Sequence, residues 1–180
     1  MKCRREDTAV LVVDYQAKLI PAIHNKEELL KRTQILLQGL QLLGVPVIIS
    51  EQYSKGLGAT VPEIREVVGD TKAHEKGSFS CWDDEGLREA INATGCKNIL
   101  VCGTETHICV LESAIDMKMA GKEVMIVADC VGSRFPQDKE MGLRRAEQEG
   151  IRVSTTETVL FEMLRFSGTP EFKAISKLIK

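Results

Sequence analysis

Short apolar runs alternate with longer amphipathic segments along most of the chain. The run Thr8–Val13 is rich in β-branched residues and is typical of a strand buried on both faces. Over Leu29–Leu43 apolar residues recur at steps of three and four, which predicts a helix that ends at Gly44. A second apolar run, Val45–Ser50, follows at once. The chain therefore begins as strand, helix, strand.

The same alternation continues to the end of the sequence. In Thr60–Glu63 the spacing of Thr and Glu resembles a capping box that opens a short helix. A weak third strand is expected at Lys72–Lys76 from the rhythm of its neighbours. Later strands are predicted at Asn98–Cys102, Glu123–Ala128 and Ile151–Ser154, and helices at about Asp83–Ala93, His107–Ala120, Asp138–Glu149, Thr156–Phe166 and Pro170–Leu178.

This order of elements predicts an α/β fold. Strands joined through helices of about ten residues form right-handed crossovers, and these give a parallel sheet covered on both faces. We therefore expect a three-layer sandwich with a six-stranded parallel sheet, in the order 3-2-1-4-5-6 that results when the chain winds outward twice from its middle. No linker or repeat interrupts the pattern, so residues 1–180 are expected to form one domain.

Composition and charge narrow the class of function. The chain has 180 residues, 43% of them hydrophobic, and a formal net charge of −2. Its longest apolar runs, Ala9–Val13 and Val124–Ala128, are far shorter than the roughly 20 residues of a membrane span. No basic block offers an electrostatic surface for nucleic acid. A small-molecule substrate is the expectation that remains.

The six cysteines are interpreted as free thiols. They form no Cys-x-x-Cys pair and no Cys/His cluster with zinc spacing, and the first residues do not resemble a secretory leader. Thiols that stay reduced are typical of a reducing compartment, so we expect a cytoplasmic protein.

Three chemically useful side chains follow predicted strands. Asp14 follows the first strand, Lys76 the third, and Gly103–Cys109 the fourth. In doubly wound sheets, ligands bind beyond the carboxyl ends of the strands where the strand order reverses. A carboxylate, an ammonium and a thiol are thus expected to converge on one crevice.

This trio suits nucleophilic catalysis. If Thr106 caps the following helix, Cys109 lies in its first turn, where free backbone N–H groups and a nearby cation lower the pKa of a thiol. Asp14 would accept the thiol proton and return it to a leaving group. An ionised Asp14 opposes a thiolate, so either Lys76 offsets that repulsion or the resting pair shares one proton.

Each of these residues also has a structural interpretation. Asp14 could cap the turn after its strand, Lys76 could be a solvated surface lysine, and Cys109 could be a small buried apolar residue. His107 lies two residues from Cys109 on a helix and would face another way, so it is interpreted as a cap or rim residue.

Three motifs together resemble a known family, the isochorismatase-like cysteine hydrolases. The motifs are Val12–Gln16, Glu75–Phe79 and Gly103–Val110. The segments Glu51–Tyr53 and Gly56–Glu63, with the tail Pro170–Lys180, narrow the resemblance to the branch called isochorismatase-domain-containing proteins.

The resemblance implies a catalytic triad of Asp14, Lys76 and Cys109. In the amide-cleaving members, the cysteine attacks a carboxamide, ammonia leaves, and water hydrolyses the thioester. The resemblance also implies a cis peptide bond at Thr104–Glu105, which aims the N–H groups of Glu105 and Cys109 at an oxyanion. Members of the family form homo-oligomers, so we expect one here.

Nicotinamidases of this superfamily hold a metal through Asp and His residues after the second strand. This chain has Glu51–Tyr53 there and no His, so no metal and no other cofactor is expected. A substrate pocket walled by aromatic residues is also expected, formed by Tyr15, Phe79, Trp82 and Phe135. A non-catalytic or redox-sensing member that binds or assembles is the alternative. A dinucleotide site is disfavoured because Gly56-x-Gly58 lacks a third glycine at the required spacing.

Overall fold

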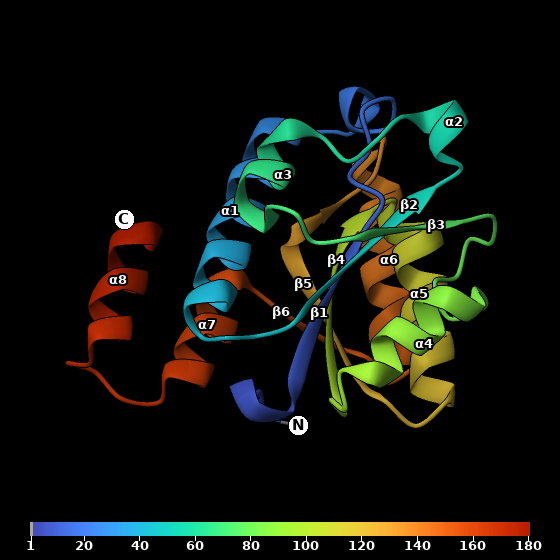
Figure 1. Cartoon of the computed structure of the whole chain (residues 1–180). Helices are drawn as coiled ribbons and strands as arrows, with labels where there is room; N and C mark the ends of the chain where they lie inside the picture. The colour runs from blue at the N-terminus through green and yellow to red at the C-terminus, as the bar shows by residue number, and fades with distance from the viewer. Residues whose placement is uncertain (1) are drawn as a thin grey trace.

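A six-stranded parallel sheet runs through the middle of the molecule (Figure 1). The structure is a computed structural model, and it describes residues 2–180. The strand order is β3-β2-β1-β4-β5-β6, which confirms the predicted order. The strands are β1 (Thr8–Val13), β2 (Val47–Gln52), β3 (Ala73–Lys76), β4 (Asn98–Thr104), β5 (Glu123–Gly132) and β6 (Arg152–Ser154).

Helices cover both faces of the sheet, as predicted. They are α1 (Lys26–Leu42), α2 (Ser54–Leu57), α3 (Pro62–Val68), α4 (Glu85–Ala93), α5 (Leu111–Met119), α6 (Pro136–Gln148), α7 (Thr156–Leu164) and α8 (Pro170–Ile179), with short 3₁₀ turns at Arg5–Asp7 and Ile20–Ala22. Helices α1, α3, α7 and α8 pack over one face, and α4, α5 and α6 over the other (Figure 1). None of the helices within residues 2–180 is both long and apolar enough to span a membrane.

Strand β1 shows how the sequence pattern builds the two cores. Its six residues are all buried, and successive side chains point to opposite faces. Val10 and Val12 join the core under α1, whereas Leu11 and Val13 join the core under α4 and α5. The unbroken apolar run at β1 therefore reflects its central place in the sheet.

Strands β1 and β4 are in close contact where the candidate site begins. Gly103 has φ +145°, and a Cβ added there would lie 2.2 Å from the carbonyl oxygen of Val13. Only glycine fits this contact. The close approach brings the end of β1 beside the end of β4, and it aligns the two segments that carry Asp14 and Glu105.

Strands β2 and β4 each run two residues past their predicted ends, and two further local predictions are wrong. The helix after Thr60 forms, but Val61 is its flanking residue and no side chain caps it. Thr60 is engaged elsewhere, because its backbone N–H and its Oγ1 donate to Glu51 Oε1 at 2.8 and 2.7 Å. Strand β5 runs on to Gly132, past the predicted end at Ala128, because it keeps pairing with β4 after an irregularity in register near Val101.

Candidate active site

Asp14 stands at the end of β1 and is anchored to both neighbouring strands. Its backbone is left-handed, with φ 51°. Its N–H donates to the carbonyl of Ser50 at 3.3 Å, and its own carbonyl accepts from Thr104 Oγ1 at 2.7 Å. Ser50 Oγ also donates to Asp14 Oδ1 at 2.6 Å. The carboxylate is thereby fixed in a fully buried position between β2 and β4.

Lys76 forms a buried ion pair with Asp14. Its Nζ lies 2.8 Å from Asp14 Oδ2, and neither side chain is exposed to solvent. The ammonium also donates to Gln52 Oε1 at 2.6 Å and to the carbonyls of Ser78 and Phe79, each at 3.1 Å. A buried charge is tolerated when paired and hydrogen-bonded in this way. The interpretation of Lys76 as a solvated surface lysine is therefore wrong.

The charges around Lys76 keep it protonated. Burial by itself lowers the pKa of the ammonium, but the Asp14 carboxylate, followed by the Cys81 and Cys109 thiols, raises it, and the net pKa lies above the ordinary value for lysine. Lys76 is therefore a fixed positive charge beside Asp14 over the physiological pH range.

Cys109 is the member of this trio that solvent reaches. Its residue keeps 8% of its surface, against none for Asp14 and 2% for Lys76. Burial, and then the negative charge of the Asp14 carboxylate, raise the pKa of Cys109 to about 12, although Lys76 lowers it. The expectation of a lowered pKa is wrong, because a thiol with this pKa keeps its proton at neutral pH.

The backbone around Cys109 differs from the predicted helix start. Thr106–Val110 forms a π-helical turn ahead of α5, and Glu105 is its flanking residue, so Thr106 is not the cap. Such turns are frequent at functional sites. Thr106 Oγ1 is buried and has no hydrogen-bond partner among residues 2–180. Helix α6 packs closely on the turn, since a Cβ added to Gly142 would lie 3.0 Å from the Cα of His107.

Glu105 is held by a second ion pair that the sequence did not reveal. The Thr104–Glu105 peptide bond is cis, as the resemblance implies. The Glu105 carboxylate accepts from the backbone N–H of Arg134 at 3.0 Å and from its Nε at 3.1 Å. Arg134 follows β5 at the same edge of the sheet. The position of Arg134 after a predicted strand could have marked it as a site residue. Its pairing with Glu105, however, depends on tertiary structure.

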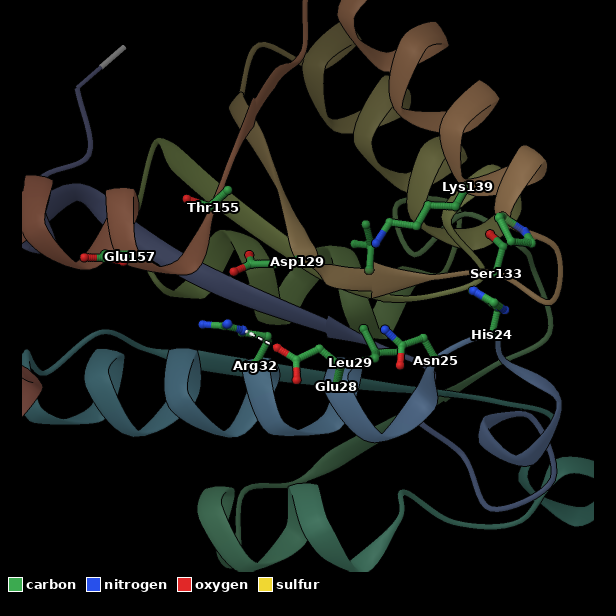
Figure 2. Close-up of a pocket in the computed structure, with 12 residues that line it drawn as sticks. His24, Asn25, Glu28, Leu29, Arg32, Asp129, Ser133, Lys139, Thr155 and Glu157 are labelled. Carbon is green, nitrogen blue, oxygen red and sulfur yellow. Dashed lines mark hydrogen bonds and ion pairs between the residues drawn. The ribbon is translucent and has the colours of Figure 1, made fainter. Parts of the chain in front are cut away.

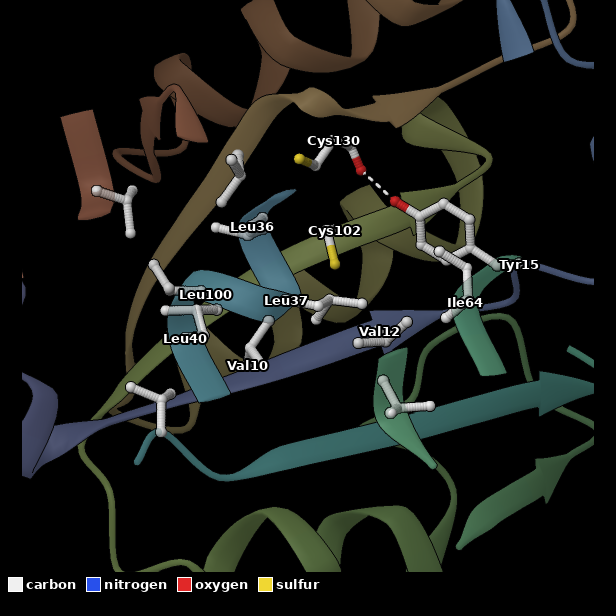
Figure 3. Close-up of a cluster of buried hydrophobic side chains, with 14 of the residues drawn as sticks. Val10, Val12, Tyr15, Leu36, Leu37, Leu40, Ile64, Leu100, Cys102 and Cys130 are labelled. Carbon is white, nitrogen blue, oxygen red and sulfur yellow. Dashed lines mark hydrogen bonds between the residues drawn. The ribbon is translucent and has the colours of Figure 1, made fainter. Parts of the chain in front are cut away.

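The four aromatic residues predicted to wall a pocket lie in different surroundings. Tyr15 is fully buried under α1, where its hydroxyl donates to the Cys130 carbonyl at 2.6 Å, so its assignment to the pocket is wrong (Figure 3). Trp82 is half-buried against the core under α4 and α5. The rings of Phe79 and Phe135 are exposed, on loops after β3 and β5.

His107 contacts the loop after β5 and helix α6. Its Nδ1 lies 3.0 Å from Ser133 Oγ and its Nε2 lies 3.8 Å from Asp138 Oδ2. It is therefore the rim residue that its spacing indicates. Across residues 2–180 no group of three or more His, Cys, Asp or Glu side chains is arranged to hold a metal ion. Glu51, near the end of β2, accepts a hydrogen bond from Thr60 and forms an ion pair with Arg65.

Comparison with known proteins matches one family over most of the chain. The model of the isochorismatase domain matches residues 8–158. Isochorismatase domain-containing protein 1 of Danio rerio is 37% identical over 93% of this chain and 59% of its own length. Isochorismatase domain-containing protein 2 of the same fish is 36% identical over 96% of this chain and 86% of its own length. This chain thus spans about three-fifths of the first relative.

Solved structures agree with this match. The MAR1 ribonuclease of Caenorhabditis elegans superposes with a TM-score of 0.92 at 30% identity, covering 99% of this chain and 92% of that one. YcaC of Pseudomonas aeruginosa, solved with hexane-2,5-diol and covalent acrylamide, gives a TM-score of 0.92 at 25% identity, covering 98% and 91%. With its sheet order and sequence matches, the chain belongs to the isochorismatase family, in the branch of the isochorismatase domain-containing proteins.

Proposed function

We propose that this chain is a metal-independent cysteine hydrolase that cleaves a small amide or a related C–N bond. One observation carries the proposal: the Cys109 thiol, the most accessible member of the trio, feels the charge of the Asp14 carboxylate, which is itself paired with a buried lysine. The family supports it. So does the covalent acrylamide in the P. aeruginosa relative, because acrylamide is an electrophile that reacts with nucleophiles.

Acylation begins with a protonated thiol. As Cys109 Sγ attacks the carbonyl carbon, its proton passes to Asp14, the S–C bond forms and the carbonyl π electrons move to oxygen. When this intermediate collapses, the C–N bond breaks and Asp14 returns the proton to the leaving nitrogen. Ammonia or an amine departs and a thioester on Cys109 remains.

Hydrolysis of the thioester reverses these roles. Asp14 takes a proton from a water molecule whose oxygen attacks the thioester carbon, and the C–S bond then breaks. The sulfur regains the proton from Asp14 and a carboxylic acid leaves. In both acylation and hydrolysis, the fixed charge of Lys76 compensates the Asp14 carboxylate whenever Asp14 carries no proton. Without it, a buried carboxylate would be costly.

The backbone before the nucleophile is assigned to the oxyanion. We place the N–H groups of Glu105 and Cys109 as its donors, with the Glu105 segment held by Arg134. Donors fixed before the reaction cost no reorganisation as charge develops.

The test measures ammonia release from a panel of small primary amides, with and without chelator. We expect turnover that survives chelation and disappears in Cys109→Ala, while Cys81→Ala, which removes the buried thiol nearby, retains it. Full turnover by Cys109→Ala would refute the nucleophile.

The alternative is a non-catalytic or redox-sensing member. The raised pKa of Cys109, about 12, favours it, since a protonated thiol is unreactive without assistance. It predicts no turnover on any amide, with a cellular effect that is lost only when assembly is disrupted. The name of the C. elegans relative adds RNA to the panel, although the net charge of −2 argues against nucleic acid here.

We also propose that this single domain assembles into a homo-oligomer in the cytoplasm. Tyr53, Phe79 and Phe135 expose 57–60% of their surface on loops at the edge that carries Asp14 and Lys76. Exposed apolar groups of this kind mark interfaces. The YcaC protein of Escherichia coli, which shares the fold, is described as an octameric hydrolase. Light scattering of the purified chain tests this, and a monomer at micromolar concentration would contradict it.

A further inference from the structure

A cavity of about 470 Å³ opens at the carboxyl edge of the sheet, and Figure 2 shows the residues that line it. The start of α1, the end of β5 and the first turns of α6 and α7 form its walls. Its lining consists of His24, Asn25, Glu28, Leu29, Arg32, Asp129, Val131, Ser133, Pro136, Lys139, Thr155 and Glu157. None of the trio Asp14, Lys76 and Cys109 lines it. Its volume falls within the usual range for small-molecule sites.

Lys139 brings an unpaired cation to this cavity. Its side chain reaches from α6 toward the cavity and is half-buried (Figure 2). Among residues 2–180 nothing accepts a hydrogen bond from its ammonium or pairs with it within 4.0 Å. Burial lowers the pKa of Lys139, and the Asp129 carboxylate only partly opposes this. An anion bound in the cavity would therefore supply the partner that the described residues do not give this ammonium.

Unpaired carboxylates lie on the walls formed by β5 and α7. Asp129 Oδ1 accepts from the N–H and Oγ1 of Thr156 at 2.8 and 3.1 Å, which fixes the start of α7. Its second oxygen, Oδ2, accepts no hydrogen bond from the described residues, and Glu157, which is exposed at the mouth of the cavity, has no cationic partner among them.

The remaining pair in the lining neutralises itself. Glu28 and Arg32 are joined at 2.7 Å along α1. Among the described residues that line the cavity, Lys139 on α6 is therefore the cation without an ion-pair partner, and Asp129 on β5 and Glu157 on α7 are the carboxylates without one. An anion alone would face those carboxylates, and a cation alone would face Lys139.

We propose that this cavity binds a small zwitterion of the amino-acid type. The carboxylate of the ligand pairs with Lys139, and its ammonium pairs with Asp129 Oδ2 and Glu157. A molecule that carries both charges pairs with Lys139 and with the carboxylates at once. A simple acid or a simple amine would pair with only one of them.

Calorimetric titration of the full chain with each of the twenty common L-amino acids tests the proposal. For the tightest binder, the matched acid without its amino group and the matched amine without its carboxylate are titrated next. We expect each half to bind at least about tenfold more weakly than the intact zwitterion. The proposal would be overturned if no amino acid bound at about 10 mM, or if either half bound as tightly as the intact zwitterion.

Two variants assign the contacts. Lys139→Met should weaken binding of the amino acid at least about tenfold and leave the matched amine unaffected, and Glu157→Gln should weaken the amino acid but not the matched acid. Lys122→Met is the matched control, because that lysine donates to the Cys96 carbonyl outside the cavity. Unchanged binding by Lys139→Met, with the melting temperature of the wild-type chain, would refute the site. Alkylation of Cys109 should be the same in all three variants, which separates this test from that of the proposed hydrolase.

Discussion

Two ion pairs flank Cys109, and they differ in almost every respect. The Asp14–Lys76 pair, at 2.8 Å, is fully removed from solvent, and further hydrogen bonds surround it. The Glu105–Arg134 pair, at 3.1 Å, leaves 53% of the arginine side chain exposed. The first pair sets the charge that the thiol experiences, because both of its members shift the pKa of Cys109. The second holds a backbone segment in place.

Breaking the buried pair should therefore cost more stability than breaking the exposed pair. Removing one member of a buried pair leaves a charge that neither water nor a partner satisfies. An exposed pair gains little, since water screens it and its long side chains lose entropy. The comparison can therefore be tested by breaking each pair separately.

The largest effect is expected from Lys76→Met. It should lower the free energy of unfolding by about 3–5 kcal/mol, because Asp14 remains buried without its cation. Urea denaturation measures this. The double variant Asp14→Asn/Lys76→Met should recover part of the loss, since no charge is left unpaired. A double variant less stable than Lys76→Met alone would contradict the account of the pair.

The reactivity and the stability that depend on Cys109 should both change with pH. The folded pKa, about 12, lies above the ordinary 9.0, so the protonated thiol contributes stability that is complete below pH 9 and is lost as the pH rises toward 12. Alkylation of Cys109 by iodoacetamide should accordingly rise about tenfold per pH unit from pH 7 to pH 10, with no plateau near pH 9. Peptide mapping of the alkylated chain measures it.

The same profile distinguishes the two pairs. Lys76→Ala should slow alkylation of Cys109 at every pH in this range, because Lys76 lowers the pKa of that thiol. Arg134→Ala should leave the pH profile unchanged. A profile that shifts equally in both variants would remove the distinction between them.

A smaller loss is expected from Ser50→Ala. Ser50 Oγ donates to Asp14 Oδ1 at 2.6 Å in a buried position. Hydrogen bonds to charged groups contribute about 1.5–3 kcal/mol, so the variant should lose that much stability while keeping the ion pair. Thr71→Val, which removes the bond from a hydroxyl to a neutral carbonyl, is the control and should lose less.

The smallest effect on stability is expected from Arg134→Ala. Its unfolding free energy should change by no more than about 1 kcal/mol, whereas turnover on any amide substrate should fall about tenfold through loss of the fixed Glu105 segment. Arg144→Ala, which breaks the exposed pair with Glu140, is the control and should leave turnover unchanged. A change in stability without a change in turnover would assign Arg134 a purely structural role.

The sequence predicted the sheet and the convergence of the trio because both follow from local patterns. Apolar runs and their spacing define the strands, and the strand order places Asp14, Lys76 and Cys109 at one edge. The cis bond at Thr104–Glu105 came from family resemblance, since neither residue type signals it.

What the sequence missed depends on contacts distant in the chain. The pKa of Cys109 reflects how deeply it is buried, which is decided by packing. Tyr15 was assigned to the pocket, but the left-handed backbone of Asp14 breaks the alternation of β1 and directs the ring under α1. Arg134 and Glu105 are 29 positions apart, and no periodicity links them.

The central claim, that Cys109 is the nucleophile, is tested most directly by limited alkylation with iodoacetamide at neutral pH, followed by mass analysis of peptides and assay of the same samples. The account predicts that Cys109 is the first of the six thiols to be modified and that turnover is lost in proportion. If Cys81 or Cys3 is modified first and Cys109→Ala keeps full turnover, the cysteine-hydrolase mechanism is wrong and Cys109 is a packing residue.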